Sequence, residues 1–263
     1  MNATAWSQYH TQKEQLRQII WTKLQTLNTV HSPCHGHIPY FIGAELAAQQ
    51  LAQLDIWRNA QVIKCNPDKA QAPVRAQALA AGKTLYMAVP RLVEDYCFIE
   101  LRREWLPENL EKPWDFMAIA QKETLLKLAR PVKFQAMCPI DLAVVGSVAA
   151  TPAGGRTGKG AGFADLELAM LQNFNLISPN TQIATTIHDA QIVTPEELPV
   201  ESHDWSLDWL CTPTRAIATQ HQHPRPQGLD WQKIQDQQWR SIPILRELQQ
   251  NFKDKSAFNG HSK

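Results

Sequence analysis

The sequence predicts an α/β fold, because short apolar runs typical of strands alternate along the chain with segments of helical periodicity. The continuous apolar run at residues 140–146 is the clearest buried strand. A glycine-rich stretch follows at 154–162, and then a helical pattern at 163–171. With 263 residues, 44% of them hydrophobic, the chain is long enough for a substantial core. We expect one domain over residues 1–248 and a polar tail over 249–263.

The N-terminal half begins with a predicted helix over residues 12–27, which has one apolar side. That side consists of Leu16, Ile19, Ile20 and Leu24. The predicted elements that follow are a helix over 44–54, a strand over 60–65, a helix over 74–81 that ends at Gly82, and a strand over 83–91. Residues 93–138 show no clear pattern, apart from surface-like stretches at 100–104 and 107–112 and a short helix at 119–128.

The C-terminal half continues the alternation after the helix at 163–171. The sequence predicts a strand over residues 181–187 and a strand-like stretch over 205–213. Residues 231–248 have a helical pattern that Pro243 interrupts, because proline removes a backbone donor and clashes with the preceding turn.

Composition excludes several classes of protein. The net charge of +1 gives no general attraction to nucleic acid or to a membrane surface. No apolar stretch approaches the roughly 20 residues of a membrane span, and the polar N-terminus does not resemble a signal peptide. The five cysteines are scattered and form no C-x-x-C pair, which fits reduced thiols in a cytoplasmic protein.

The glycine-rich stretch predicts an anion site. Gly158, Gly160 and Gly162 let backbone N–H groups approach a ligand, and the N-terminus of the following helix adds partial positive charge. Arg156 and Lys159 add full charges, which favours phosphate over a merely mobile surface loop. The stretch is neither a P-loop nor a Rossmann fingerprint, since the spacing of its glycines fits neither pattern.

Histidines offer weaker candidates. His31, Cys34, His35 and His37 stand in one loop, but their spacing is too tight and irregular for a usual zinc motif. His188 follows a predicted strand directly, so it is either a site residue or a histidine satisfied within the core.

The string Arg156-Thr-Gly-Lys-Gly-Ala-Gly-Phe-Ala-Asp-Leu-Glu167 resembles the phosphate loop of the 5-formyltetrahydrofolate cyclo-ligases, and most closely the loop of their cyclo-ligase-like, domain-containing branch. Other strings resemble this family in the same order along the chain. They are Lys13-Glu-Gln-Leu-Arg17, Asn66-Pro-Asp-Lys69, Pro90-Arg91, residues 141–148, residues 187–193 and residues 212–217. The resemblance implies a three-layer sandwich with a mainly parallel, Rossmann-like sheet.

The resemblance also implies an ATP- and Mg²⁺-dependent ligase that converts 5-formyltetrahydrofolate to 5,10-methenyltetrahydrofolate. On this interpretation Lys159, Arg156 and His188 are catalytic, and Asp165 binds magnesium. The nucleotide would be bound by Lys13, Arg17, Arg91, Gly158, Gly160 and Gly162.

The chain departs from the enzymes mainly on the folate side. Ala161 replaces a loop lysine, Phe163 and Ala164 replace two tyrosines, and the acid expected near Ala70 is missing. ATP is therefore better supported than folate, and two alternatives remain: a thiamin-related amide as substrate, or a nucleotide-binding module without catalysis. Vertebrate members of the branch carry an RNA-recognition domain, but this chain has no RNP1-like string, so we expect a small-molecule partner and no nucleic acid.

Overall fold

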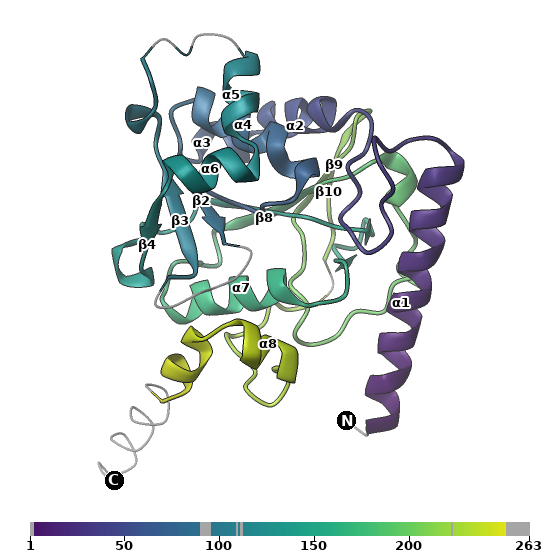
Figure 1. Ribbon diagram of the computed structural model, residues 1–263. Helices are drawn as coiled ribbons and strands as arrows, with labels where there is room; N and C mark the ends of the chain where they lie inside the picture. The colour runs from purple at the N-terminus through teal and green to yellow at the C-terminus, as the bar shows by residue number, and fades with distance from the viewer. Residues whose placement is uncertain (1–2, 90–95, 109, 111–112, 222, 251–263) are drawn as a thin grey trace.

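The computed structural model describes residues 3–89, 96–108, 110, 113–221 and 223–250 (Figure 1). Its centre is an eight-stranded sheet in the order β10-β9-β8-β5-β1-β2-β3-β4. Neighbours among five central strands pair in parallel, with registers such as Ile63 opposite Leu142. These strands are β9 (Trp209–Cys211), β8 (Gln182–Thr186), β5 (Leu142–Val145), β1 (Val62–Cys65) and β2 (Thr84–Ala88). The mainly parallel sheet that we predicted is confirmed.

The two edges of the sheet are antiparallel. On one side β10 (Ala216–Ala218) pairs with β9, and on the other β3 (Phe98–Leu101) and β4 (Arg130–Val132) extend the sheet beyond β2. Pro131 lies within β4, where an edge strand can spare a donor. None of these three strands was predicted from the sequence. The predicted surface position of residues 100–104 was wrong at Leu101, which is buried in the pairing of β3 with β2.

Helices cover both faces of the sheet and confirm the three-layer sandwich (Figure 1). One face carries α2 (Ala44–Ala52), α3 (Asp55–Asn59), α4 (Ala72–Ala80), α5 (Pro113–Ile119) and α6 (Lys122–Leu128). The opposite face carries α7 (Phe163–Asn173) and α8 (Asp236–Ser241), and residues 244–250 are helical beyond the predicted break near Pro243. Short 3₁₀ turns connect these layers: η1 (Lys69–Gln71), η2 (Arg103–Trp105), η3 (Phe134–Ala136) and η4 (Asp189–Gln191).

The long first helix, α1 (Ala3–Thr26), lies beside this sandwich and packs on a separate cluster that includes Phe41 and Val148. Leu16, Ile20 and Leu24 face that cluster as predicted, but Ile19 points away and is 61% exposed. No helix in the described part of the chain combines the length and apolarity needed to cross a membrane.

The order of the strands creates a crevice between β1 and β5. The chain leaves β1 through α4 on one face to reach β2, and it leaves β5 through α7 on the opposite face to reach β8. The loops after these two neighbouring strands therefore separate at their carboxyl ends. Asn66 and Gly146 follow the two strands at this point. Open α/β sheets bind ligands in such crevices.

Candidate active site

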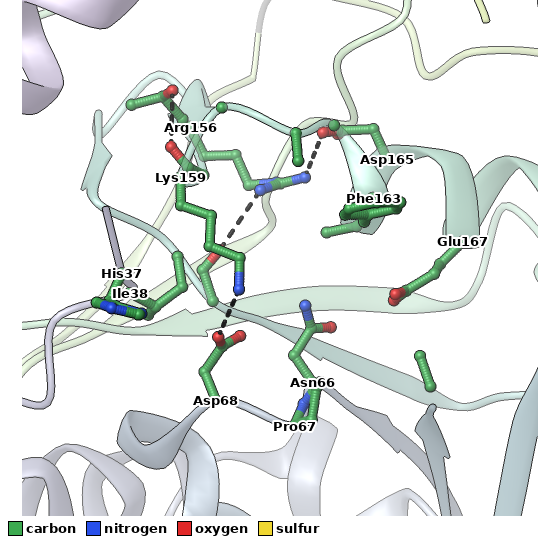
Figure 2. A pocket seen from close by; sticks show the side chains of 18 of the residues that line it. His37, Ile38, Asn66, Pro67, Asp68, Arg156, Lys159, Phe163, Asp165 and Glu167 are labelled. Atoms are coloured by element: carbon green, nitrogen blue, oxygen red, sulfur yellow. Dashed lines mark hydrogen bonds and ion pairs between the residues drawn. The ribbon is translucent and has the colours of Figure 1, made fainter. Parts of the chain in front are cut away.

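A cavity of about 630 Å³ opens at this crevice (Figure 2). Asn66 and Asp68 enter it from the end of β1, and Gly146 enters from the end of β5. The glycine loop, the start of α7 and the basic face of α1 complete its wall. The structure therefore brings segments together that lie far apart in the sequence.

The glycine loop connects a short hairpin, β6 (Ala149–Ala150) and β7 (Arg156–Thr157), to the first turn of α7. Gly160 and Gly162 have φ of 108° and 64°, a region that side chains disfavour. Gly162 is the N-cap of α7 and supplies no capping side chain. The first N–H groups of α7 thus remain available to an anion at the cavity.

Arg156 projects from β7 into the cavity and is 3% exposed. One terminal nitrogen lies 2.6 Å from Asp165 Oδ2, and the other donates to the Gly146 carbonyl at 3.5 Å (Figure 2). Its Nε finds no hydrogen-bond partner in the described part of the chain. A buried guanidinium with an unused donor is poised to bind a further acceptor, such as a phosphate oxygen.

The two basic residues of α1 reach the same wall. Lys13 is 7% exposed, and its Nζ lies 2.6 Å from Asp204 Oδ2 and 3.2 Å from Glu201 Oε2. Arg17 donates to Thr157 Oγ1 at 3.0 Å and pairs with Glu14 at 2.6 Å. Both side chains are buried at the cavity rather than solvated on the surface of α1.

Lys159 differs from the other cations. Its side chain is 43% exposed, and Nζ lies 3.4 Å from Asp68 Oδ1 across the mouth of the cavity (Figure 2). A long, weakly held pair in partial contact with water contributes little to stability. Lys159 can therefore change partner at small cost when an anion enters.

Asp165 lies in the first turn of α7, and both its carboxylate oxygens are engaged. Oδ2 pairs with Arg156, and Oδ1 accepts from the Trp205 backbone N–H at 3.0 Å. Each oxygen keeps a second lone pair, so Asp165 retains the capacity to bind a cation. The neighbouring Glu201, His203 and Asp204 are the one group with ligand atoms within 4.8 Å of one another among the residues that the structure describes.

The histidine-containing loop at 31–37 forms no such group within the described residues. Its side chains have other contacts: His31 packs on Tyr40, His35 contacts Gln18, and the Cys34 thiol faces the Trp21 carbonyl.

The structure does not bring His188 into the cavity. Its Nδ1 accepts from the Ala190 N–H at 3.1 Å and so caps η4, while its ring packs edge-on against Phe41. Burial lowers the pKa of His188, which favours the neutral ring that this cap requires. The expectation that His188 acts with Arg156 is therefore not supported by its position. Arg91 lies outside the described residues.

Sequence reasoning missed four polar residues at this site. Lys64, Asn66, Arg75 and Glu167 are all buried, and all except Lys64 line the cavity. Two of them carried a signal: Lys64 lies within an apolar strand, and Glu167 lies on the buried side of an amphipathic helix. Charges at such positions are rare unless they are paired.

Comparison with known proteins agrees with this fold. The model of the 5-formyltetrahydrofolate cyclo-ligase family matches residues 9–213. The human methenyltetrahydrofolate synthase domain-containing protein is 38% identical over 248 residues, which cover 90% of this chain and 61% of the human protein. The Danio rerio protein of the same description is 36% identical over 239 residues, with the same coverage. The chain thus spans less than two thirds of the length of these relatives.

A solved structure supports the fold alone. The NMR structure of Aquifex aeolicus 5,10-methenyltetrahydrofolate synthetase matches with a TM-score of 0.51 at 18% identity, covering 84% of this chain and 99% of that one. The family match over residues 9–213, which is more than half of the chain, settles the classification. The chain belongs to the 5-formyltetrahydrofolate cyclo-ligase family.

Proposed function

We propose that this protein is an ATP- and magnesium-dependent ligase of the cyclo-ligase type, which forms a carbon–nitrogen bond within a formylated substrate such as 5-formyltetrahydrofolate. One observation carries the proposal. Buried cations from two distant segments, Lys13 and Arg17 of α1 and Arg156 of β7, meet at the uncapped start of α7. Cations and free backbone donors at a helix N-terminus are what a polyphosphate requires.

The residues present fit the phosphates of ATP. The Nε of Arg156 lacks a partner among the described residues, and a Cβ on Gly160 would lie 3.3 Å from the Arg17 guanidinium. A side chain there would fill the space next to that guanidinium. Gly158, Gly160 and Gly162 keep this side of the cavity open for a ligand.

ATP would supply the phosphoryl group that turns the formyl oxygen into a leaving group, and this transfer would release ADP. Attack of the second nitrogen on the formyl carbon would then close the ring and release phosphate. The chain's own cations would bind and orient the phosphates, and they would neutralise the charge that develops there. Arg156 and Arg17 are fixed by their neighbours and suit orientation. Lys159 is partly exposed and suits contact with the outermost phosphate. Arg91 remains a predicted contributor.

Asp165 remains our proposed magnesium ligand, since this carboxylate lines the cavity next to Arg156. The reducing cytoplasm is the proposed location, because all five cysteines are free thiols. Ala161, Phe163 and Ala164 differ from the residues of the cyclo-ligases and favour two alternatives to folate turnover. The substrate is a thiamin-related amide, or the protein binds a nucleotide without catalysis.

The test is calorimetry with Mg-ATP on wild type, Arg156→Ala and Lys159→Ala. We expect Arg156→Ala to weaken ATP binding by about 1.5–3 kcal/mol, the range for hydrogen bonds to charged groups, and Lys159→Ala to weaken it less. Arg156→Lys keeps the positive charge but cannot form the two parallel hydrogen bonds of a guanidinium, so its affinity for ATP should lie between those of wild type and Arg156→Ala. Arg58→Ala, at an exposed site on α3, is the control. Unchanged affinity in both loop variants would contradict the proposal.

The absorbance of the methenyl product, followed with 5-formyltetrahydrofolate and Mg-ATP present, then separates turnover from binding alone.

A further inference from the structure

Lys64 stands in the middle of the sheet with no exposure to solvent. Side chains alternate along β1, and its neighbours Ile63 and Cys65 point into the core under α4. Lys64 therefore points to the opposite face, toward α7. A lysine in a central parallel strand needs a built environment, because an unpaired buried charge is costly.

That environment consists of two residues that line the cavity. Lys64 Nζ lies 2.6 Å from Glu167 Oε2 and donates to Asn66 Oδ1. Asn66 is two residues from Lys64 and shares its face of the strand, while Glu167 reaches down from α7. Because an ammonium group only donates, it fixes which end of the Asn66 amide faces Lys64.

The pairing leaves one acceptor and one donor without hydrogen-bond partners among the described residues. These are Glu167 Oε1 and Asn66 Nδ2. Figure 2 shows both side chains extending into the same part of the cavity, from α7 and from the end of β1. A carboxylate oxygen repels phosphate, so this part of the cavity differs in chemistry from the side that holds Arg156 and Lys159.

Apolar surface adjoins this polar pair. Phe163 and Ala164 precede Glu167 by four and three residues, so all three share one face of α7, and all three line the cavity. Ala88 and Val89 approach from the end of β2. A flat ring with a polar edge fits a wall of this composition.

We infer that Glu167 and Asn66 determine specificity for the second substrate, a planar nitrogen heterocycle that carries an N–H donor beside a ring acceptor. Glu167 Oε1 accepts from the N–H group of this ring, and Asn66 Nδ2 donates to its acceptor. Lys64 is a positioning residue, because it orients both groups and leaves their outer atoms for the ligand. This inference rests on the proposed function and names the substrate class of the same site. It assigns the wall to the ring being closed rather than to the adenine of ATP.

The test uses two variants that spare the fold. Lys64→Met/Glu167→Gln removes both charges together, since removing one would strand the other in the core. Asn66→Asp keeps the shape and the contact with Lys64 but replaces the outward donor with an acceptor. Asn180→Asp, at an exposed position, is the matched control. Each protein is titrated separately with Mg-ATP, with 5-formyltetrahydrofolate and with thiamin.

We expect both site variants to bind the heterocycle at least tenfold more weakly than wild type, while ATP affinity stays within about twofold. Unchanged heterocycle affinity would overturn the inference. An equal loss of ATP affinity would also overturn it, because the wall would then hold adenine. Wild-type protein that binds ATP but neither heterocycle would refute the substrate class and leave the phosphate site intact. Failure of wild type to bind ATP would refute the proposed function, and the heterocycle titrations would still decide this inference.

Discussion

Arg75 holds the turn that carries two cavity residues, Asn66 and Asp68. The residue has no exposure to solvent, and its guanidinium donates to three backbone carbonyls. Nε donates to Ala120 at 3.0 Å, and one terminal nitrogen donates to Asn66 and, at 3.1 Å, to Asp68. Arg75 thereby ties α4 to the end of β1, where Asn66 and Asp68 enter the cavity. We predict that Arg75→Met loosens this turn.

The size of the effect follows from these contacts. Each hydrogen bond from a charged donor stabilises by about 1.5–3 kcal/mol, and three of them are lost. Part of this loss is offset, because burial of the guanidinium is itself unfavourable and lowers the pKa of Arg75. Methionine also fills much of the same volume. The net loss in free energy of unfolding should be about 2–4 kcal/mol, which lowers Tm by roughly 5–15 °C for a chain of this size.

Urea unfolding of wild type and Arg75→Met at equal protein concentration measures this difference. Arg58→Met is the control, because Arg58 is an exposed arginine in a surface ion pair and its loss should cost less than about 0.5 kcal/mol. Binding of Mg-ATP should also weaken in Arg75→Met, since Asp68, which pairs with Lys159 at the cavity, would lose its fixed position. A loss below about 1 kcal/mol, together with unchanged ATP affinity, would refute the role of Arg75 as a clamp.

Three further predictions follow from the site and its surroundings. Gly160→Ala should destabilise the fold by about 1–2 kcal/mol, because φ is 108° there, and should weaken Mg-ATP binding; wild-type affinity in calorimetry would count against the loop as the phosphate site. Burial lowers the pKa of His188, so the contribution of this residue to stability is present above pH 6.5 and is lost as the pH falls through its folded pKa. In urea unfolding, His188→Asn should therefore lose less stability than wild type when the pH is lowered from 7.5 to 5. Equal losses in the two proteins would argue against a neutral His188. Cys138 is the exposed cysteine, whereas burial raises the pKa of Cys65 to about 11 and that of Cys97 and Cys211 to about 12. One thiol per native chain should therefore react rapidly with a thiol reagent. Cys138→Ser should abolish that fast phase.

The sequence predicted those parts of the fold whose local pattern is strong. The buried strands β1, β5 and β8 and the amphipathic helix α7 were all identified from apolar runs and helical spacing. The strands β3, β4 and β10 were missed because they lie at or beside the edges of the sheet, where pairing with a neighbour rather than composition defines them. Local pattern also misplaced Ile19, because the cluster under α1 decides which side of that helix is buried.

Some residues of the candidate site could likewise be predicted from the sequence, and others could not. The glycine-rich pattern indicated Arg156 and Lys159, the resemblance indicated Lys13 and Arg17, and the structure gathers all four at one cavity. The acidic partners of Lys13 were not identified, since Asp204 lies 191 residues from Lys13 and periodicity carries no information over that separation. His188 was misjudged because its place after a strand suggested the ligand side of the sheet, whereas its ring nitrogen caps a short turn.

The central claim is that the cavity between β1 and β5 binds the phosphates of ATP through Arg156. Calorimetric titration of wild type and Arg156→Ala with Mg-ATP tests it most directly, with Arg58→Ala as the control. The account predicts saturable binding to wild type and to the control, and at least tenfold weaker binding to Arg156→Ala. Equal affinity in all three proteins, or no binding to wild type, would contradict it.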